Sequence, residues 1–339
     1  MANNETSGKV FRLGLVGAGG ISSAHIAAVK ASEGRLAIVA VADPVESARN
    51  KAAAETGAQA FESFDSMALA MAGDLRIDGL LVCTPPSARL KIVKKALKVK
   101  VPILTEKPIA HTLAEGKKIA ALAAQHKKRV AAVGFCHRFA PAIVEMKRLV
   151  ADGKIGRLVR FENVFACDLP GHSDKWFSDP KRAGGGAALD MGSHSIDLFH
   201  FLVGPAKVAG SVADSKWKGR SETAATILLK STKASNKFVK AGVAGVVLSG
   251  WAETCRFELS LVGDAGMLSY NYEKPTELVF RDLSGKAEST PIESHEVRFK
   301  NQLLAFADAV SSKAKTNLAT FGDGVAVSAI NTAAGKNAR

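Results

Sequence analysis

Four polar residues interrupt an otherwise apolar stretch, AGGGAALDMGSHSIDLFHFLVG, at residues 183–204. If the stretch forms one helix, at about 100° per residue Asp190, His194 and Asp197 lie on one face, while His200 points elsewhere. A histidine exchanges a proton near neutral pH, and an adjacent carboxylate orients it and supports its cationic form. The spacing therefore allows acid–base chemistry, although on spacing alone a buried structural pair is the simpler interpretation.

A second pair of charged residues, Glu106 and Lys107, lies in the motif TEKP (105–108) at the end of an apolar run. Open α/β sheets bind their ligands at this carboxyl edge of the strands. Opposite charges that are partly buried there are costly unless they serve a ligand. A lysine beside a reacting hydroxyl would stabilise negative charge as it develops. A surface ion pair that ends the strand is the alternative.

A glycine-rich turn, VGAGGIS (16–22), follows the first apolar run. Gly17 allows a tight turn, Gly19 lets the backbone approach a pyrophosphate, and the following helix directs its N–H groups at the anion. Asp43 closes the second run, where it would accept hydrogen bonds from ribose hydroxyls and repel a 2′-phosphate. The pattern predicts dinucleotide binding, with NAD favoured and NADP kept open by Arg49. A helix N-cap is the alternative role for Asp43.

The first part of the chain would position these residues on a parallel sheet. Continuous apolar runs alternate there with segments of helical period, as in strands that are buried on both faces between helices. The runs are at 11–17, 36–43, 79–85, 101–108 and 129–135. The pattern predicts an α/β fold, with a doubly wound Rossmann domain at residues 1–139.

The second part of the chain has a different pattern of predicted helices and strands. A helix at 141–153 is followed by successive strands without long helices between most of them, and two helices end the chain. The strands are expected at 158–166, 222–230, 245–251, 256–263, 267–272 and 277–282. This order indicates an antiparallel sheet, so residues 140–339 are predicted to form an α+β domain.

The composition of the chain is typical of a folded globular protein and argues against several other classes. The 339 residues are 47% hydrophobic and 23% charged, and no apolar run approaches the roughly 18 residues that span a bilayer. The polar start lacks the pattern of a secretory signal, and the four cysteines show no metal-ligand spacing. The net charge of +14 is spread through amphipathic helices, which indicates solvated faces. We expect a cytoplasmic protein without a disulfide, a metal, a membrane segment or a nucleic-acid partner.

Together the motifs resemble the Gfo/Idh/MocA family of oxidoreductases, which includes glucose-fructose oxidoreductase and inositol dehydrogenases. The resemblance runs from about residue 11 to about 335 and rests on VGAGGIS, VADP, CTPP, TEKP, GFCHRFAP, GKIG, WFSDPKRAGGG, DMGSHSID, VGDAG and FGDGVAVSAI. It implies a Rossmann domain and a C-terminal domain with a large, open, mainly antiparallel sheet, which commonly forms homodimers or homotetramers. It also implies NAD(P)-dependent redox chemistry on a sugar, a cyclitol or a related polyhydroxy substrate.

The resemblance also implies roles for single residues. His194 would take the hydroxyl proton as a hydride leaves the carbon, Lys107 would stabilise the alkoxide-like oxygen, and Asp190 would position both. This chemistry needs no metal. The residues implied in cofactor binding are Gly17, Gly19, Gly20, Ile21, Asp43, Thr84, Pro85, Arg89, Glu106 and Lys107. Those implied in substrate binding are Arg138, Asp168, Trp176 and Asp197.

Two positions depart from the family pattern. The segment TPPSAR (84–89) places Pro86 and Arg89 where the family commonly shows TPNxxH, so contacts near the nicotinamide ribose are expected to differ. His137 precedes the arginine of the RF motif, where it could contact substrate or only pack. Three other functions stay open. One is a glycosidase that oxidises and re-reduces its sugar with tightly held NAD, and another is a non-catalytic nucleotide- or sugar-binding regulator. The third is a nucleic-acid binder, which an absence of salt-sensitive binding to DNA or RNA would remove.

Overall fold

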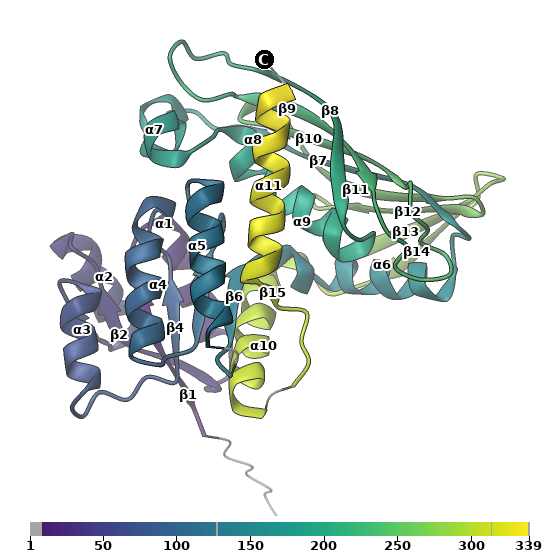
Figure 1. The fold of residues 1–339 in the computed structure, drawn as a ribbon. Coiled ribbons are helices and arrows are strands. Elements are labelled where there is room, and N and C mark those ends of the chain that lie inside the picture. The colour runs from purple at the N-terminus through teal and green to yellow at the C-terminus, as the bar shows by residue number, and fades with distance from the viewer. Residues whose placement is uncertain (1–8, 127, 313, 338–339) are drawn as a thin grey trace, which may run out of the picture. The chain divides into compact units, whose positions relative to one another are not determined.

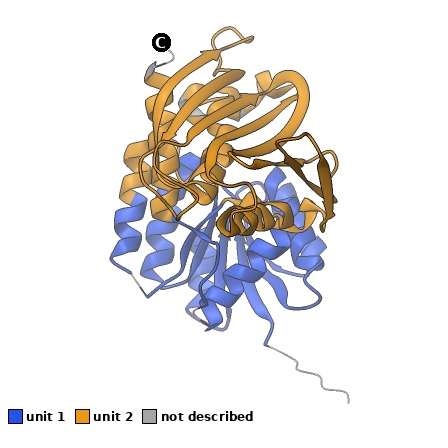
Figure 2. Cartoon of the chain, turned by 90° about the vertical axis from the view of Figure 1, so that its right-hand side faces the viewer, with its two compact units in different colours: residues 1–106, 119–134, 299–320 blue, residues 107–118, 135–298, 321–339 orange. Residues whose placement is uncertain are grey.

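The computed structural model describes residues 9–126, 128–312 and 314–337, apart from the side chains of Trp176, Lys181, Arg182 and Asn337. The polar N-terminal segment, predicted to be a tail, lies outside these residues. The chain forms two compact units whose segments interleave in sequence (Figure 2). Unit 1 comprises residues up to 106, 119–134 and 299–320, and unit 2 comprises 107–118, 135–298 and 321 onward. The domain boundary after residue 139 stays a prediction.

Unit 1 is built on a sheet with the order β15-β6-β5-β4-β1-β2-β3 in the described residues. Neighbouring strands are parallel except β6 and β15. The strands are β1 (Phe11–Val16), β2 (Leu36–Ala42), β3 (Gln59–Phe61), β4 (Gly79–Val82), β5 (Ile103–Glu106), β6 (Ala131–Gly134) and β15 (Ala319–Thr320). The main helices of this part of the chain are α1 (Gly20–Lys30), α2 (Glu46–Thr56), α3 (Phe64–Met71), α4 (Arg89–Lys98), α5 (Leu113–Ala124) and α10 (Arg298–Ser312) (Figure 1). The predicted doubly wound fold is confirmed, and the strand order reverses at β1 and β4.

Helix packing explains why the strands of unit 1 are continuously apolar. Every residue of β4 and β5 is buried, as expected for strands covered on both faces. Helix α10 supplies part of this core, and the rings of Phe306 and Phe11 meet edge to face with centroids 5.9 Å apart. A helix near the C-terminus therefore completes the core around the first strand.

Unit 2 contains a second, mainly antiparallel sheet with the order β14-β13-β12-β11-β7-β10-β9-β8 in the described residues. Only β10 and β7 pair in parallel there. The strands are β7 (Leu158–Asp168), β8 (Ala206–Asp214), β9 (Ala224–Ser231), β10 (Ala244–Gly250), β11 (Ala252–Gly263), β12 (Gly266–Asn271), β13 (Glu277–Asp282) and β14 (Ala287–Pro291). The predicted α+β class is confirmed. Strands β8 and β14 were not expected, because β8 (AKVAGSVAD) is rich in small residues and β14 (AESTP) is exposed along its whole length.

The prediction of a single helix at 183–204 is wrong. The segment forms α7 (Pro180–Ala183), α8 (Ala187–Asp190) and α9 (Gly192–Leu202). Gly184 adopts a φ of +88°, and a Cβ there would lie 2.0 Å from the carbonyl oxygen of His111. Glycine in this left-handed conformation ends a helix. Gly184 thus separates α7 from α8, whereas α8 and α9 are separated by Met191, whose backbone stays in the right-handed helical region. Of the four polar residues, Asp190 lies in α8 and the other three lie in α9.

Helix α9 is fixed on the sheet of unit 2 by an aromatic contact. The ring of Phe199 meets that of Phe161 on β7 edge to face, with centroids 5.3 Å apart. Gly245 of β10 leaves room for this ring, because a Cβ there would lie 2.5 Å from Phe199. The remaining helices of the unit are α6 (Pro141–Asp152) and α11 (Phe321–Asn337), and short 3₁₀ turns include η2 (Cys136–Phe139), η4 (Trp176–Ser178) and η5 (His295–Val297).

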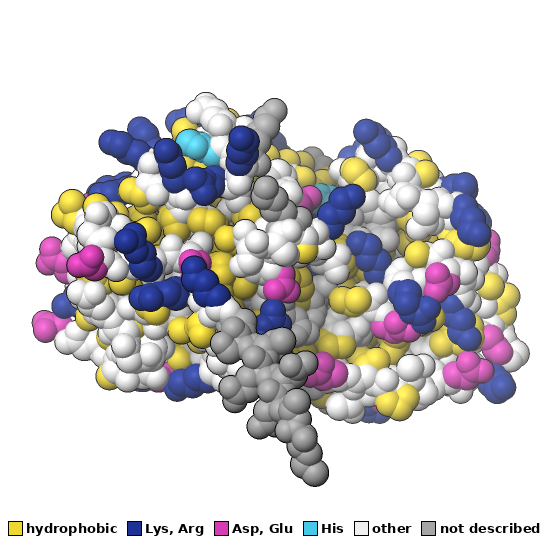
Figure 3. All heavy atoms as spheres, turned by 90° about the horizontal axis from the view of Figure 1, so that it is seen from below, with side chains coloured by type: hydrophobic (Ala, Val, Ile, Leu, Met, Phe, Trp, Pro, Cys, Tyr) yellow, Lys and Arg dark blue, Asp and Glu magenta, His cyan; other side chains and the backbone are white. Residues whose placement is uncertain are grey.

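Basic side chains are dispersed on the face drawn in Figure 3, where Lys and Arg alternate with hydrophobic and uncharged groups. This distribution agrees with solvated helix faces. Within the described parts of the chain, no helix combines the length and the apolarity needed to cross a membrane.

Gly79, at the start of β4, is expected to tolerate no side chain. A Cβ there would lie 2.6 Å from the ring of Phe306 and 3.0 Å from that of Phe11. Gly79→Ala should lower the free energy of unfolding by about 1–3 kcal/mol, because two buried rings must shift. Gly73→Ala is the control, since the nearest described atom lies at an ordinary 3.5 Å. Urea unfolding followed by circular dichroism measures both, and equal midpoints would contradict the prediction.

Candidate functional site

The predicted dinucleotide turn joins β1 and α1 in unit 1. Gly17 has a φ of +95°, and a Cβ there would lie 2.8 Å from the carbonyl carbon of Cys83, so this position requires glycine. At Gly19 and Gly20, no described atom lies within 4 Å of a Cβ position. No described side chain caps α1, although the Ser22 N–H donates to the carbonyl oxygen of Gly19 at 3.0 Å, and an uncapped helix start can face an anion. The turn fits a pyrophosphate.

Asp43 holds this turn at the end of β2. Its Oδ2 accepts a hydrogen bond from the Ala18 N–H at 2.7 Å, and its Oδ1 accepts one from the Val45 N–H at 2.8 Å. Helix α2 begins at Glu46 with Val45 as its N-cap, so Asp43 is not the cap residue. Arg49 donates to the carbonyl oxygen of Asp43 at 2.9 Å. The carboxylate lies beside the glycine turn, as the ribose-binding hypothesis requires.

A buried polar cluster ties together the two motifs that follow β4 and β5. Glu106 is 4% exposed, and its Oε1 lies 2.7 Å from His25 Nε2. Arg89 donates to the carbonyl oxygen of Thr84 at 3.1 and 2.9 Å and to that of Glu106. Burial lowers the pKa of Arg89 to about 10, although the charge of Glu106 opposes this effect. The arginine that departs from the family pattern thus joins two loops.

The residues implied in cofactor binding, apart from Lys107 of unit 2, gather at one edge of the unit 1 sheet. They lie at or just after the carboxyl ends of β1, β2, β4 and β5, and such ends meet at the same edge of a parallel sheet. In strand order they are Gly17, Gly19, Gly20 and Ile21, then Asp43, then Thr84, Pro85 and Arg89, then Glu106. Ile21 and Pro85 are exposed at this edge. Their contacts with a cofactor remain a proposal.

Unit 2 contains a cavity of about 360 Å³ that brings together the three residues with implied catalytic roles. Lys107 and Asp190 meet there although 83 positions separate them in the chain. The cavity is lined by Lys107, His137, Phe165, Asp190, Met191, His194, Phe257, Tyr272, Glu273, His295 and Arg298. Charged groups and three histidines thus share one space with aromatic side chains, a combination that is common in small-molecule sites.

Lys107 and Asp190 form a salt bridge at the entrance to α9. Lys107 Nζ donates to Asp190 Oδ1 at 2.5 Å and to its carbonyl oxygen at 3.0 Å. The indole N–H of Trp251, a fully buried residue, donates to Asp190 Oδ2 at 3.1 Å. Burial raises the pKa of Asp190, but the charge and hydrogen bonds of Lys107 and Trp251 outweigh it and lower the pKa overall. Asp190 therefore stays ionised and holds the lysine ammonium in the cavity.

His194 is not oriented by Asp190 in the way its spacing suggested. No hydrogen bond among the described residues joins the two, because Lys107 and Trp251 engage the carboxylate. Nδ1 of His194 is buried without a hydrogen-bond partner among the described atoms, which leaves Nε2 as the nitrogen that can face a substrate. Burial, aided by the nearby His137, holds the pKa of His194 well below its ordinary range. The imidazole is neutral and suited to accept a proton.

Several lining residues were missed or undecided from the sequence. Tyr272 closes an expected strand, and its alternation with Tyr270 indicates a shared sheet face, the one signal that could have identified it. His295 and Arg298 lie in and after η5, a short turn without periodicity. His137, for which substrate contact and packing were both open, lines the cavity.

Arg138 and Asp197 pair with each other in unit 2. Arg138 donates through Nε and Nη2 to the two carboxylate oxygens at 2.8 and 2.6 Å, and the residues are 6% and 1% exposed. Asp323 lies 3.7 Å from the same guanidinium. Neither Arg138 nor Asp197 is among the described residues that line the cavity. Their geometry ties η2 to α9, and their substrate contact stays a prediction.

The two remaining residues with implied substrate roles lie near the end of β7. Asp168 ends this strand and is exposed. Trp176 begins η4, and its side chain lies outside the described part of the structure. Nearby, the ring of His172 packs between Phe177 and Trp251, with centroids 4.3 and 5.8 Å away. Burial, aided by the charge of Arg138, lowers the pKa of His200 to about 4, which is consistent with a packing role.

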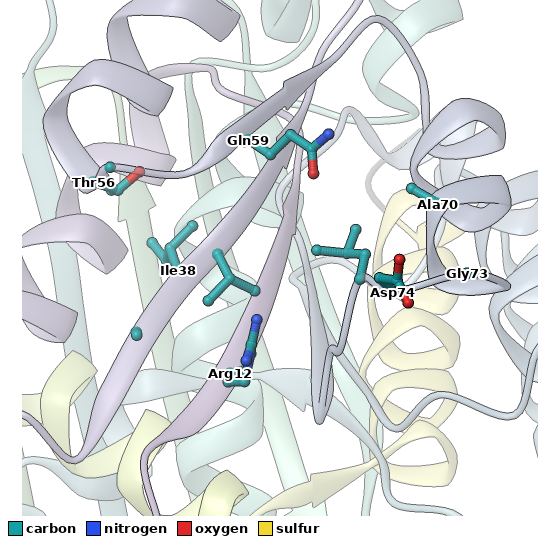
Figure 4. Close-up of a pocket in the computed structure, with 11 residues that line it drawn as sticks. Arg12, Ile38, Thr56, Gln59, Ala70, Gly73 and Asp74 are labelled. Atoms are coloured by element: carbon teal, nitrogen blue, oxygen red, sulfur yellow. The ribbon is translucent and has the colours of Figure 1, made fainter.

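A larger cavity of about 770 Å³ opens near the amino-terminal halves of β1 and β2 in unit 1 (Figure 4). Arg12, Thr56, Gln59 and Asp74 contribute its polar groups. Among the described residues, none with an implied catalytic or binding role lines it. The predicted chemistry belongs to the opposite, carboxyl ends of these strands.

Comparison with known protein families gives two matches that together cover most of the chain. Residues 11–135 match a model described as oxidoreductase family, NAD-binding Rossmann fold, and residues 143–269 match the GFO/IDH/MocA C-terminal domain. Unit 1 therefore carries an NAD-binding Rossmann fold. The resemblance predicted from the motifs is confirmed.

Curated relatives match over parts of their length. The chain is 32% identical to the rhizopine catabolism protein MocA of Rhizobium meliloti over 206 residues, and the aligned region covers 61% of each protein. It is 33% identical over 153 residues to an inositol 2-dehydrogenase of Corynebacterium glutamicum, or 44% of each chain. It is 30% identical over 215 residues to the levoglucosan dehydrogenase of Pseudarthrobacter phenanthrenivorans, or 61% of this chain and 54% of the relative. The chain thus spans about half the length of the curated relatives it matches.

Solved structures share the fold. A levoglucosan dehydrogenase in complex with NADH and levoglucosan superposes with a TM-score of 0.85 at 20% identity, over 97% of both chains. An inositol dehydrogenase homolog from Azotobacter vinelandii, complexed with NAD⁺, gives 0.85 at 18% identity, over 97% of this chain and 95% of the other. At these identities the likeness shows the fold alone.

The ion pair of Arg138 and Asp197 is expected to behave as a structural unit. Asp197→Asn should lower the free energy of unfolding by about 3–5 kcal/mol, because it leaves a buried guanidinium without its bidentate partner. The double variant Arg138→Met/Asp197→Leu should recover most of this loss, since apolar groups of similar volume can replace a buried pair. Chemical denaturation measures both variants. A double variant less stable than Asp197→Asn would contradict the prediction.

Proposed function

Because the chain belongs to the Gfo/Idh/MocA family of oxidoreductases, we propose that it is an NAD-dependent dehydrogenase. Its substrate class would be a sugar, a cyclitol or a related polyhydroxy compound. The observation that carries this proposal is the cavity of unit 2, in which Lys107, Asp190 and His194 are lining residues. The names of the relatives, which include inositol 2-dehydrogenase and levoglucosan dehydrogenase, support the substrate class.

The reaction we propose converts a secondary alcohol to a ketone. Nε2 of neutral His194 accepts the hydroxyl proton, and the ammonium of Lys107 donates a hydrogen bond to the oxygen as negative charge develops on it. Asp190 holds the ammonium in place through its 2.5 Å contact. Bound NAD⁺ would supply the acceptor for the hydride, so the alcohol loses two electrons, NADH forms, and one proton is released through His194.

We propose NAD as the cofactor of the carboxyl edge of unit 1. The glycine turn would bind the pyrophosphate, since Gly19 and Gly20 leave room for it and the N–H groups of α1 are uncapped by described side chains. Asp43 would accept hydrogen bonds from the adenosine ribose and disfavour a 2′-phosphate. Use of NADP, a dimeric or tetrameric state and a cytoplasmic location stay predictions.

The test of this function is a screen of myo-inositol, levoglucosan, aldoses and sugar acids for formation of NADH and NADPH, with hydrolysis products followed in parallel. Net NADH formation supports the dehydrogenase. Release of a hydrolysed sugar without NADH would instead favour the NAD-dependent glycosidase. Binding of NAD without turnover of any compound would favour the regulator.

Loss of the proposed base should remove most of the activity. His194→Ala is expected to lower kcat by about 10²- to 10⁴-fold, with little change in NAD affinity, because it removes proton transfer and leaves unit 1 intact. In the wild type, kcat/KM for oxidation should fall only on the acid side of neutrality, since the lowered pKa keeps His194 neutral at higher pH. Steady-state kinetics across pH measure both effects. An unchanged kcat in the variant would refute the role of His194.

Asp43 is expected to set the choice between the two nicotinamide cofactors. Asp43→Ala should raise the ratio of NADP to NAD efficiency by at least about tenfold, because the carboxylate no longer repels a 2′-phosphate. The ratio is the readout, since the variant also loses the bond to Ala18 and binds either cofactor less tightly. Arg49→Ala serves as the partner variant, and reduced use of NADP there would identify Arg49 as a phosphate contact. An unchanged ratio in Asp43→Ala would contradict the assignment.

A further inference from the structure

His194 lacks the carboxylate that commonly orients a proton-accepting histidine. Its Nδ1 is buried without a hydrogen-bond partner among the described atoms. Asp190, four positions earlier in the chain, is engaged by Lys107 and Trp251. A buried imidazole without such a bond can rotate unless packing restrains it, so another group must fix its ring.

Two aromatic contacts restrain this ring from the side of η2. The ring of Phe135 lies edge to face with its centroid 6.3 Å away and an interplanar angle of 81°. The ring of His137 is closer, with a centroid separation of 4.6 Å and an angle of 66°. Of these two neighbours, only His137 is polar, and it lines the same cavity as His194.

His137 is itself held in one orientation by Tyr272. Its Nδ1 lies 3.0 Å from the Tyr272 hydroxyl oxygen, and the two ring centroids are 5.3 Å apart. Tyr272 is 8% exposed, and its backbone N–H donates to the carbonyl oxygen of Phe257 at 2.8 Å. The ring of Phe165 contacts both members, with centroids 5.0 Å from His137 and 5.3 Å from Tyr272. The pair is therefore rigidly attached to the sheet of unit 2.

We propose that the hydrogen-bonded pair of Tyr272 and His137 is a positioning unit that fixes the imidazole ring of His194 for proton transfer. The proposal rests on the proposed function, because it assigns the pair a role in the same reaction. Tyr272 acts on His137 through the hydrogen bond, and His137 acts on His194 through the edge-to-face contact. Neither residue needs to touch the substrate for this role.

The chain contains a matched pair that lacks the contact with His194. Tyr270 lies two positions before Tyr272, and its hydroxyl oxygen is also 3.0 Å from the Nδ1 of a histidine, His295. The rings of the two tyrosines lie 4.7 Å apart, so both are in one cluster. Among the described ring contacts of His194, however, none involves Tyr270 or His295. Removing either hydroxyl thus costs a bond to a histidine, and at Tyr270 also a longer bond to the carbonyl oxygen of Pro275 at 3.4 Å. Only the loss at Tyr272 should affect His194.

The experiment compares Tyr272→Phe with Tyr270→Phe, using the substrate that gives the highest NADH rate in the screen. Tyr272→Phe should lower kcat by about tenfold or more, because a misplaced base reacts slowly. KM for NAD should not change in either variant. Tyr270→Phe should keep kcat within about twofold of the wild type. Equal values of kcat in the two variants would overturn the proposal, because a structural role alone would affect both alike.

Substitutions of His137 separate the hydrogen bond from the ring contact. His137→Phe keeps a ring beside His194 but cannot bond to Tyr272, whereas His137→Asn keeps a polar group near the hydroxyl and loses the ring. Both should lower kcat. In the His137→Phe background, Tyr272→Phe should cause no further loss, because the bond is already absent. Additive losses in the double variant would show that the residues act separately and would overturn the pair. If Tyr272→Phe melts at a much lower temperature than Tyr270→Phe, the kcat values of those two variants cannot be compared. The His137 variants then test the positioning role.

The pH profile gives a readout that packing alone would not move. The titratable and charged groups that act on His194 are Cys136 and His137 from η2, Lys107 after β5 and Arg298 at the start of α10. Tyr272→Phe should change the acid limb of kcat/KM, since the environment of the base changes, and Tyr270→Phe should leave it in place. An acid limb that is the same in wild type and Tyr272→Phe would count against the proposal.

A measurement without substrate keeps this test distinct from that of the proposed function. In protein labelled with ¹⁵N-histidine, the imidazole resonances of His194 should shift or broaden in Tyr272→Phe and stay unchanged in Tyr270→Phe. This result would support the positioning unit even if no compound in the screen produced NADH, in which case the dehydrogenase alone would fail. Unchanged His194 resonances in Tyr272→Phe would overturn the positioning unit even if the dehydrogenase were established.

Discussion

The salt bridge between Lys107 and Asp190 is the contact on which the cavity of unit 2 depends. Burying two opposite charges is costly unless their hydrogen bonds are satisfied. Here the ammonium bonds to a carboxylate oxygen and a carbonyl oxygen of Asp190, and Trp251 bonds to the second carboxylate oxygen. The pair therefore holds a positive charge in a fixed place beside His194. This contact joins two segments that are 83 positions apart in the chain, because Lys107 follows β5 and Asp190 ends α8.

Asp190 and His194 line the same cavity but have different protonation states. Asp190 remains ionised because a lysine neutralises it, whereas His194 remains neutral because burial and nearby positive charge disfavour its protonation. A charged donor and a neutral acceptor at one site suit the removal of a proton and the stabilisation of the oxygen it leaves. Aromatic rings of Phe165 and Tyr272 line the same space.

Arg89 in unit 1 departs from the family pattern at the carboxyl edge of the sheet. Arg89 occupies the position where the family commonly has a histidine, and its guanidinium bonds to backbone carbonyl oxygens of Thr84 and Glu106. Its planar fork of donors suits this bridging role. The departure thus has a structural explanation, and Asp43 still accepts a hydrogen bond from the Ala18 N–H of the glycine turn.

The sequence by itself determined the local elements and the motifs. Buried parallel strands, the glycine turn and the alternating strands of unit 2 follow from residue types within short segments, which set periodicity and turn chemistry. Only the tertiary structure decided which distant groups meet. It divided the stretch 183–204 at Gly184 and at Met191, joined Arg138 to Asp197, and placed Tyr272 and His295 around the same cavity as His194. Such pairings depend on how separate segments pack, and a pattern within one segment carries no information about its partner.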